Sequence, residues 1–356
     1  MSNRAALVIL TACLAGGCAG SVPESAGSGG GGPGADAPCP PEKLVCVGDP
    51  DGHVVCRCQG ELWDCSKYPE KCEENQPPTT ATAPPVSPMP QGGGTYRCET
   101  SSAGPLLGAA SAFNVFVLGD LDKSGSDTEG RMAVGGNAKL AGYSVGTALT
   151  NSNGARDDLI VGGNLTFNGG TVPNGNAAYG VSASLSGVSF PNGSARQAKP
   201  LNFAGAGAEL KQTSAKLAAM APNGSTFTAF SQVQLKGSAA QVNVFKVDGA
   251  ALSSASSLSV AAPAGSTVIV NVGGADVQMS SVGYSISGTD RQRVLFNFHQ
   301  ATTLHFEGVG LEGSVLAPHA KVEFSNGNIN GVLAAGSLSG PGENHEHPFD
   351  GCAPAL

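Results

Sequence analysis

Short apolar runs, each broken by glycine or asparagine, recur through the C-terminal three quarters of this chain. The phrase at residues 133–138 returns at 160–165 and, more loosely, at 271–276. Two related phrases, at 315–318 and 332–335, lie about one short coil apart. Small residues let the backbone turn tightly, so each phrase predicts a short strand that ends at a corner. Repetition of this kind predicts stacked coils, and the fold class is therefore mainly β, a β-solenoid of short parallel strands.

One segment has the periodicity of a helix. Phe203, Leu210 and Leu217 recur at seven-residue spacing and form one apolar stripe, which the breakers at 222–224 terminate. The pattern predicts one long amphipathic helix over 203–220, packed alongside the solenoid. Other apolar runs predict individual strands, at 112–118, 268–270 and 294–298.

Composition supports a packed chain with little charge. Glycine accounts for 52 of 356 residues, 40% of the chain is hydrophobic and only 13% is charged. Enough apolar residues are present to build a sizeable core. The net charge of −8 and the absence of a basic stripe argue against nucleic acid as a partner.

The N-terminus has the features of a bacterial export signal. Arg4 precedes a short apolar run at 5–14, which is too short to span a bilayer as a helix. The sequence Ala-Gly-Gly-Cys that ends at Cys18 resembles a lipobox. The sequence Leu-Thr-Ala-Cys that ends at Cys13 is the alternative. Acylation of this cysteine would anchor the protein to the cell envelope, at the outer membrane or cell surface. An ordinary cleaved signal is the remaining reading.

Eight further cysteines follow the signal, an even number that predicts disulfides in an exported protein. No C-x-x-C pair or Cys/His quartet with zinc spacing is present. Cys98 and Cys352 bracket the long C-terminal region, and a bond between them would tie its two ends together. The other six form a cluster whose fifteen pairings stay open: Cys39, Cys46, Cys56, Cys58, Cys65 and Cys72.

These features divide the chain into five parts. The Gly/Ser/Pro-rich stretch after the signal predicts a flexible tether, and the later Pro-rich stretch predicts a stiffer linker. The cysteine cluster between them is too short to form a core without disulfides. The predicted parts are a lipoprotein signal at 1–17, a tether at 18–38, a disulfide module at 39–75, a linker at 76–95 and the solenoid at 96–354.

Several phrases in the long region resemble the choice-of-anchor A domain of bacterial surface proteins. They are FNVF at 113–116, EGRMAVGGN at 129–137, DLIVGGN at 158–164, LFNF at 295–298, GSVLAP at 313–318 and a closing stretch at 336–349. Members of this family are described as collagen-binding or adhesin-like, and their fold resembles the β-solenoid of ice-binding-like domains. The resemblance implies a non-enzymatic surface module that binds an extracellular-matrix protein or a polysaccharide.

Two polar clusters are candidates for metal binding. Asp120, Asp122 and Ser124 match the first half of a calcium loop, and Asp127 and Glu129 add carboxylates. At the twelfth position of such a loop, where a bidentate glutamate should bind the ion, this chain has Arg131. A loop of acidic surface residues is therefore the alternative interpretation. No cofactor other than Ca²⁺ is indicated. In the second cluster, at 343–350, the two histidines of His-Glu-His would point to one side of an extended segment. The family resemblance implies instead a structural hydrogen bond from His347.

Three classes of function therefore remain. The resemblance and the flat sides of a solenoid favour a binding or scaffolding module without catalysis. A polysaccharide-acting β-helix enzyme would need carboxylates gathered along one groove. An ice-binding or ordered-surface-binding protein would need a regular row of threonines on a flat face. The oligomeric state is left open.

Overall fold

The computed structural model describes residues 44–49, 52–59, 62–66, 95–99 and 104–355, and for the first three ranges the backbone alone. The chain divides into two units, Met1–Val86 and Ser87–Leu356. In the first unit three strands form an antiparallel sheet: β1 (Leu44–Asp49), β2 (Gly52–Gln59) and β3 (Leu62–Ser66).

The register of this small sheet places Cys56 opposite Cys65. Cys39 and Cys72 lie outside the described residues, as do the predicted signal, the tether and nearly all of the second linker. The pairing of the six clustered cysteines and the lipidation of Cys18 or Cys13 therefore stay predictions.

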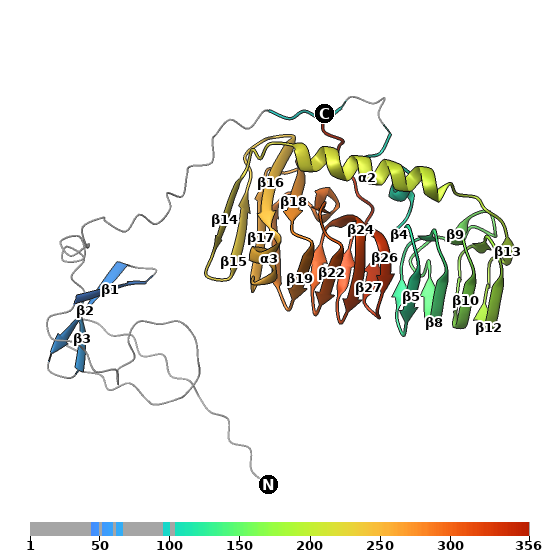
Figure 1. Ribbon diagram of the computed structural model, residues 1–356, viewed down its shortest axis with the longest axis horizontal. Helices are drawn as coiled ribbons and strands as arrows, with labels where there is room; N and C mark the ends of the chain where they lie inside the picture. The colour runs from blue at the N-terminus through green and yellow to red at the C-terminus, as the bar shows by residue number, and fades with distance from the viewer. Residues whose placement is uncertain (1–43, 50–51, 60–61, 67–94, 100–103, 356) are drawn as a thin grey trace, which may run out of the picture. The chain divides into compact units, whose positions relative to one another are not determined.

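The second unit is a three-sided solenoid of parallel strands, which confirms the predicted fold class (Figure 1). One complete coil consists of β21 (Val294–Phe298), β22 (Thr303–Glu307) and β23 (Gly310–Glu312), each of which pairs with the next coil on a different side. We call the three sides the helix face, the polar flank and the third face.

Strands of the helix face are β16 (Val242–Asp248), β18 (Thr267–Gly273), β21, the first part of β24 (Ser314–Ser325), the first part of β26 (Leu333–Ser339), β4 (Val115–Val117), β7 (Met132–Val134), β9 (Asp157–Val161), β11 (Asn176–Tyr179) and β13 (Ala195–Gln197). The polar flank contains β19 (Asp276–Ser280), β22, the second parts of β24 and β26, β5 (Leu121–Ser124), the first parts of β8 (Ala138–Val145) and β10 (Leu165–Thr171), and β12 (Ala183–Ser189).

The third face contains β23, β25 (Asn328–Asn330), β27 (Glu343–His345), β6 (Asp127–Thr128) and the second parts of β8, β10 and β12. Next to β23 begins a separate four-stranded sheet in the order β20 (Gly283–Gly288), β17 (Ser257–Ala262), β15 (Gln232–Lys236) and β14 (Ser225–Ala229). Two short helical segments complete these coils, α3 (Gly249–Ser253) and η2 (Arg291–Arg293).

The coils are not stacked in the order of the sequence. The first coil, β4 to β6, lies in the middle, and the chain proceeds through β7 to β13 toward one end (Figure 1). Helix α2 (Phe203–Ala219) then crosses to the opposite end, from which the later coils return toward the middle. There the last coil pairs with the first, and the register places Leu333 opposite Val115 and Leu338 opposite Leu121. One continuous parallel ladder therefore joins residues from the two ends of this region.

Inward-facing side chains of all three sides form the main core. Aromatic rings pack edge to face along its interior, with Phe306 6.0 Å from both Phe298 and Phe324 between ring centroids. Lys123 and Asn344 are among the polar residues that are fully buried in the described part of the chain. Both lie where the first and last coils meet.

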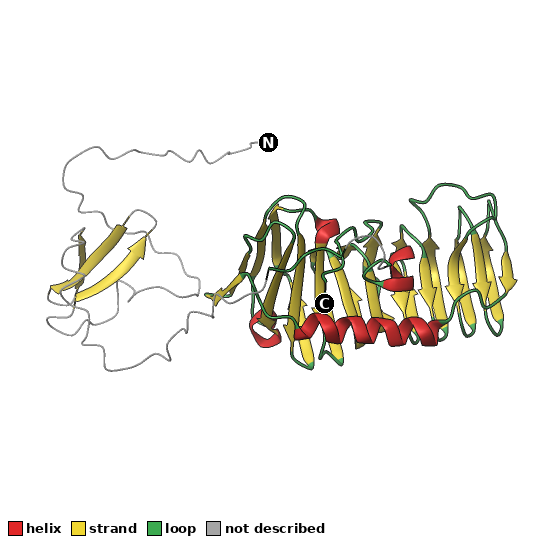
Figure 2. Cartoon of the chain, turned by 90° about the horizontal axis from the view of Figure 1, so that it is seen from above, coloured by secondary structure: helices red, strands yellow, loops and turns green. Residues whose placement is uncertain are grey.

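The predicted helix is confirmed as α2, which runs across the strands of the helix face (Figure 2). Asn202 caps its first turn by accepting a hydrogen bond from the backbone N–H of Gly205 at 3.0 Å. The stripe that contains Leu210 and Leu217 is buried in a second apolar cluster, between the helix and the outward side chains of the helix face. The stripe is therefore core, as predicted.

Two buried asparagines fasten the helix to the sheet. The side-chain amide of Asn271 donates to the carbonyl oxygen of Leu217 at 2.7 Å. That of Asn297 donates to the carbonyl oxygen of Ser214 at 2.9 Å and to Oδ1 of Asn271 at 2.8 Å. Ser214 Oγ in turn donates to Oδ1 of Asn297 at 2.6 Å. These bonds satisfy polar groups that the helix buries between its ends.

The repeated Gly-Gly-Asn phrases are corner turns between the helix face and the polar flank, as predicted. A Cβ atom on Gly135 would lie 2.3 Å from the carbonyl oxygen of Leu118, and one on Gly162 would lie 2.5 Å from that of Gly135. Adjacent coils approach so closely at this corner that only glycine fits.

The strand predicted over 112–118 is shorter than expected. A 3-10 helix, η1 (Gly108–Ala112), occupies the start of this run and only β4 is a strand. Asn114 instead uses its side chain to join coils: its amide donates to the carbonyl oxygens of Gly331 at 2.8 Å and His345 at 2.9 Å. Because Asn114 lies within an apolar run, the sequence pattern predicts a strand residue there and gives no sign of these side-chain hydrogen bonds.

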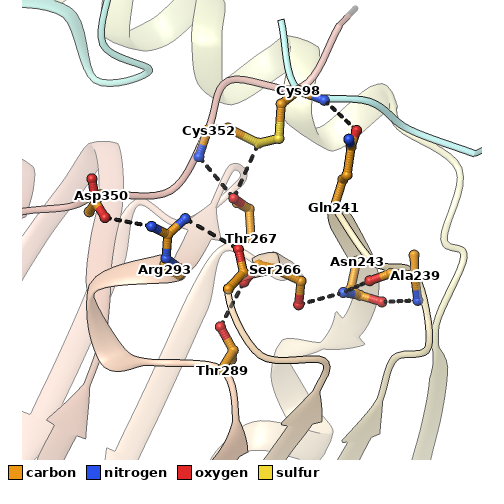
Figure 3. The surroundings of a disulfide bond; sticks show 11 residues. Cys98, Ala239, Gln241, Asn243, Ser266, Thr267, Thr289, Arg293, Asp350 and Cys352 are labelled. Atoms are coloured by element: carbon orange, nitrogen blue, oxygen red, sulfur yellow. Dashed lines mark hydrogen bonds and ion pairs between the residues drawn. A yellow bond between two sulfur atoms is a disulfide. The ribbon is translucent and has the colours of Figure 1, made fainter.

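Cys98 and Cys352 form a disulfide, with their Cα atoms 5.4 Å apart (Figure 3). The two segments also pair through their backbones, since Glu99 N–H donates to the carbonyl oxygen of Ala353 at 2.8 Å. The backbone N–H of Cys352 donates to Oγ1 of Thr267 at the start of β18 at 2.9 Å. The disulfide and these hydrogen bonds together hold both ends of the region against the solenoid.

Candidate binding surface

The polar flank presents one unbroken row of polar side chains to solvent. Each residue of the row lies opposite the next in the register of adjacent strands, and all project outward because alternate residues of a strand face opposite sides. At a strand spacing of about 4.8 Å, eight strands give a row roughly 34 Å long. The row runs through Gln278, His305, Glu323, Ser339, Asp122, Lys139, Thr166 and Ser184.

Opposite charges alternate in the centre of this flank. Lys139 Nζ lies 3.1 Å from Asp122 on the adjacent strand, and both side chains are more than half exposed. Glu323 accepts a hydrogen bond from Lys321 Nζ at 2.6 Å and lies 3.2 Å from Nδ1 of His305. The hydrogen bond from Lys321 and its positive charge are the main causes that lower the pKa of the Glu323 carboxyl group, and His305 lowers this pKa further. The centre of the flank is therefore charged, with Lys139 and Lys321 balancing Asp122 and Glu323.

A hollow of about 490 Å³ opens in this flank where the last coil meets the first. The short side chains of Ser337 and Ser339 lie between the longer Lys321 on one side and Lys139 on the other. The lining is rich in hydroxyl, amide, carboxylate and ammonium groups: Asp120, Leu121, Asp122, Asn137, Ala138, Lys139, Asn164, Thr166, Lys321, Ser337, Leu338 and Ser339.

A ladder of hydrogen bonds borders the hollow along the Gly-Gly-Asn corner. Asp120 Oδ1 accepts from the backbone N–H of Asn137 at 2.7 Å and from its side-chain amide at 3.2 Å. Asn137 Oδ1 accepts in the same way from Asn164, at 3.0 Å in both cases. Ser182 Oγ extends the ladder by donating to Asn164 Oδ1 at 2.7 Å. The asparagines of the repeated phrase thus hold the edge of the hollow in a fixed geometry.

The structure does not gather the five candidate calcium ligands around one point. Asp120 bonds to Asn137, and Asp122 pairs with Lys139. Asp127 accepts from Thr147 Oγ1 at 2.6 Å, and Glu129 accepts from the backbone N–H of Glu346 at 2.8 Å. Ser124 lies outward on β5 beyond Asp122. Among the residues described, no group of three or more His, Cys, Asp or Glu side chains is arranged to hold a metal ion.

The closing segment is held by His345 rather than by the expected ring of His347. His345 Nδ1 lies 2.8 Å from Oδ1 of Asn330, and its Nε2 lies 3.3 Å from Glu343. Burial lowers the pKa of His347, with neighbouring Arg291 as a further cause. The side chain of His345 therefore joins β27 to β25 within the closing part of the solenoid.

Comparison with known protein families identifies the family of this chain. The family described as "Putative Ice-binding-like adhesive domain" matches residues 106–346. The chain belongs to this family. Its match spans the whole solenoid from η1 to β27, so the family's domain is the solenoid itself. No curated protein sequence matches the chain.

Solved structures similar to this adhesive domain include an ice-binding protein from the Antarctic ascomycete Antarctomyces psychrotrophicus. It is 14% identical, with a TM-score of 0.35, and the match covers 67% of this chain and 96% of that one. An ice-binding protein from an Antarctic biological consortium is 14% identical, with a TM-score of 0.31 and coverage of 70% and 93%. An ice-binding protein from an Arctic yeast is 13% identical, with a TM-score of 0.30 and coverage of 70% and 96%.

Sequence reasoning found one side of the hollow and missed the other. Asp120 and Asp122 were singled out, although for a different chemistry, and the Gly-Gly-Asn corners were located correctly. Lys321, Ser337 and Ser339 were missed because they come from coils about 200 residues away in sequence. In the described part of the chain no helix is both long and apolar enough to cross a membrane.

Proposed function

We propose that this protein is a non-enzymatic surface adhesin whose solenoid binds a hydroxyl-rich polymer, an extracellular polysaccharide, along the polar flank. The hollow at the junction of the first and last coils carries the proposal. Its hydroxyl, amide and charged groups can donate and accept hydrogen bonds in close succession, as a row of sugar hydroxyls requires. The fixed asparagine ladder supplies a preorganised edge, and preorganisation lowers the ordering cost of binding.

The rest of the chain would serve to display this domain. We propose that Cys18, or alternatively Cys13, is acylated and anchors the protein to the outer membrane or cell surface. The tether at 18–38, the module at 39–75 and the linker at 76–95 would then hold the solenoid away from the membrane. In this arrangement the domain would be a choice-of-anchor A domain with a lipid as its anchor. The family match to an adhesive domain supports the display of the solenoid at a surface.

Two other functions fit the flank less well. The ice-binding names of the structural relatives suggest ordered water as a ligand, but the row contains one threonine, Thr166, among charged residues. A polysaccharide-acting enzyme would need free carboxylates, whereas Asp120 and Asp122 are each held by a neighbouring side chain. Binding without turnover is the function that these contacts favour.

The test is binding of the full chain to arrayed polysaccharides and matrix proteins, with thermal hysteresis and sugar release measured on the same protein. Ser339→Tyr places a large ring in the hollow and should reduce polysaccharide binding at least tenfold. Ser287→Tyr is the matched control, because Ser287 is an exposed serine on β20, outside the polar flank. Equal effects of the two variants would exclude the hollow, and capture of matrix proteins alone would reject the polysaccharide.

A further inference from the structure

Large exposed apolar side chains of the solenoid are confined to its two ends. Among the residues described, only four are substantially exposed. Two are at one end, Val181 at 53% just before β12 and Leu185 at 39% within it, and two are on the β14–β15 hairpin, Phe227 at 49% and Phe230 at 90%. Strand β14 is the outermost strand at its end of the solenoid (Figure 1). The two phenylalanines differ from the rest of the surface and require an explanation.

The turn of this hairpin is unfavourable for the residues that form it. Ala229 pairs with Gln232, so the loop consists of Phe230 and Ser231 alone, and their φ angles are +53° and +57°. Two-residue loops of this kind favour Asn-Gly, because bulky residues rarely adopt positive φ. A phenylalanine here costs backbone energy and is not repaid by burial within the chain. Strained positions that persist in this way are often functional.

Among the residues described, no strand pairs with the outer edge of β14. Because Ala229 and Gln232 flank a two-residue turn, residues 225, 227 and 229 bond to β15, and the N–H and C=O groups of Thr226 and Thr228 point away from it. Natural edge strands are usually blocked by lysine, proline or a bulge. The strand Ser-Thr-Phe-Thr-Ala has none of these. Its edge is open to another strand.

We propose that β14 pairs with β14 of a second copy of this chain, antiparallel about a two-fold axis through Phe227. The strand reads almost the same in both directions from this residue: small, Thr, Phe, Thr, small. Pairing about Phe227 places Thr226 opposite Thr228 of the second copy, so the outward backbone groups of both bond in register. The two Phe227 rings then meet as a pair that forms no backbone hydrogen bonds, where side chains are closest.

The same register places Phe230 next to the interface. It follows the last residue of β14, so it lies close to the point where the strand of the second copy begins at Ser225. No residue of β14 is charged, so the copies meet no repulsion between like charges along the strand. A self-complementary patch of this kind is what a two-fold interface requires. The surface is therefore assigned to a second copy rather than to a different protein.

Sedimentation velocity of the full chain, with Cys13 and Cys18 replaced by Ser to exclude acylation, tests the dimer. We expect a concentration-dependent dimer that Phe227→Lys weakens at least tenfold, by placing two ammonium groups opposite each other. Leu185→Lys, at the other end of the solenoid, should leave the dimer unchanged. A wild-type protein that stays monomeric at all concentrations, or a loss of association in both variants, would overturn the proposal.

Cysteine cross-linking tests the register without changing either phenylalanine. Ser225 falls opposite Ala229 of the second copy, so a mixture of Ser225→Cys and Ala229→Cys proteins should form a disulfide-linked dimer under oxidising conditions. Each variant alone should not, because its own cysteine has no counterpart. Cross-linking of neither the mixture nor the single variants, or of a single variant as efficiently as the mixture, would contradict this register. The assay also decides the case if Phe227→Lys fails to fold.

Discussion

The ammonium nitrogen of Lys123 donates a hydrogen bond to the carbonyl oxygen of Gly342, 219 residues further along the chain. The contact joins the first coil to the last inside the solenoid. Lys123 is fully buried, with its nitrogen 5.4 Å from the ring centroid of Phe324 and 5.7 Å from that of Tyr143. Burial lowers the pKa of this ammonium group to about 7, although Asp127 and Glu343 act in the opposite direction.

Stability should therefore rise with pH in the window above pH 7. The folded state holds the proton of Lys123 less tightly than the unfolded state, so the full cost is present below pH 7 and falls as the pH rises toward the ordinary lysine pKa of 10.5. We expect the free energy of unfolding to increase by on the order of 1 kcal/mol per pH unit between pH 7 and 9. Burial raises the pKa of Tyr143, which keeps this phenol neutral throughout the window.

Urea unfolding at several pH values provides the measurement, with Lys123→Met as the comparison. The variant removes the titrating group while keeping an unbranched chain in the core. Its stability should exceed that of the wild type at pH 7 and lack the rise. Parallel pH profiles for the two proteins would show that Lys123 is not the group responsible.

Glycine at the Gly-Gly-Asn corner should be indispensable. In Gly135→Ala the new Cβ would meet the carbonyl oxygen of Leu118 at 2.3 Å, and backbone must move to relieve the contact. We expect a loss of about 2–4 kcal/mol, in the range that severe core disruptions produce. Gly104→Ala is the control, since no atom lies within 4 Å of its added Cβ, and its midpoint in urea should match that of the wild type.

The hydrogen bonds from Asn271 and Asn297 to helix α2 should contribute measurably to the stability of the domain. Asn297→Ala removes the donor to the carbonyl oxygen of Ser214 and leaves the Ser214 hydroxyl and Asn271 Oδ1 without this partner. Unsatisfied buried groups of this kind cost about 1–3 kcal/mol each. Thermal unfolding of Asn297→Ala should show a lower midpoint, and Asn168→Ala, on the exposed polar flank, should not. A midpoint equal to that of the wild type would mean that the apolar stripe alone holds the helix.

The disulfide should stabilise the domain because it closes a long loop in the unfolded chain. Cys98 and Cys352 are 254 residues apart in sequence, and for such a loop the chain-entropy model allows up to about 5 kcal/mol. The double variant Cys98→Ala, Cys352→Ala should unfold at lower urea concentration and lose the effect that reductant has on the wild type. An unchanged midpoint would show that the paired backbone segments suffice.

Lipid anchoring can be tested through the two candidate cysteines. Cys18→Ala should release the protein from membranes into the soluble fraction, because no acyl chain could be attached. Metabolic labelling with a fatty acid follows the modification directly. Continued labelling of Cys18→Ala, together with its loss in Cys13→Ala, would identify Cys13 as the modified residue.

Local patterns predicted the elements of this fold but not their order. The stripe through Leu210 gave helix α2 to within a residue, and the glycines of the repeated phrase gave the corners, because both depend on neighbouring residues. The junction between Leu121 and Leu338 left no local trace, since parallel pairing between distant strands has no sequence signal at either strand. The hollow spans that junction, so it was beyond prediction for the same reason. Asn114, in an apolar run, was misjudged because its bonds reach the last coil.

The docking of the last coil on the first has a consequence for how the domain is made. The middle of the ladder requires β26 and β27, which are synthesised after every other strand of the solenoid. Until they arrive, the first coil presents an open edge and the two halves of the solenoid are joined only by helix α2 and its flanking segments. Contacts between residues so far apart in sequence form slowly, because a large loop must close before they stabilise the chain. Folding is thus completed at the centre of the solenoid, after both halves exist, and a chain cut short before β26 lacks the continuity on which the flank and its hollow depend.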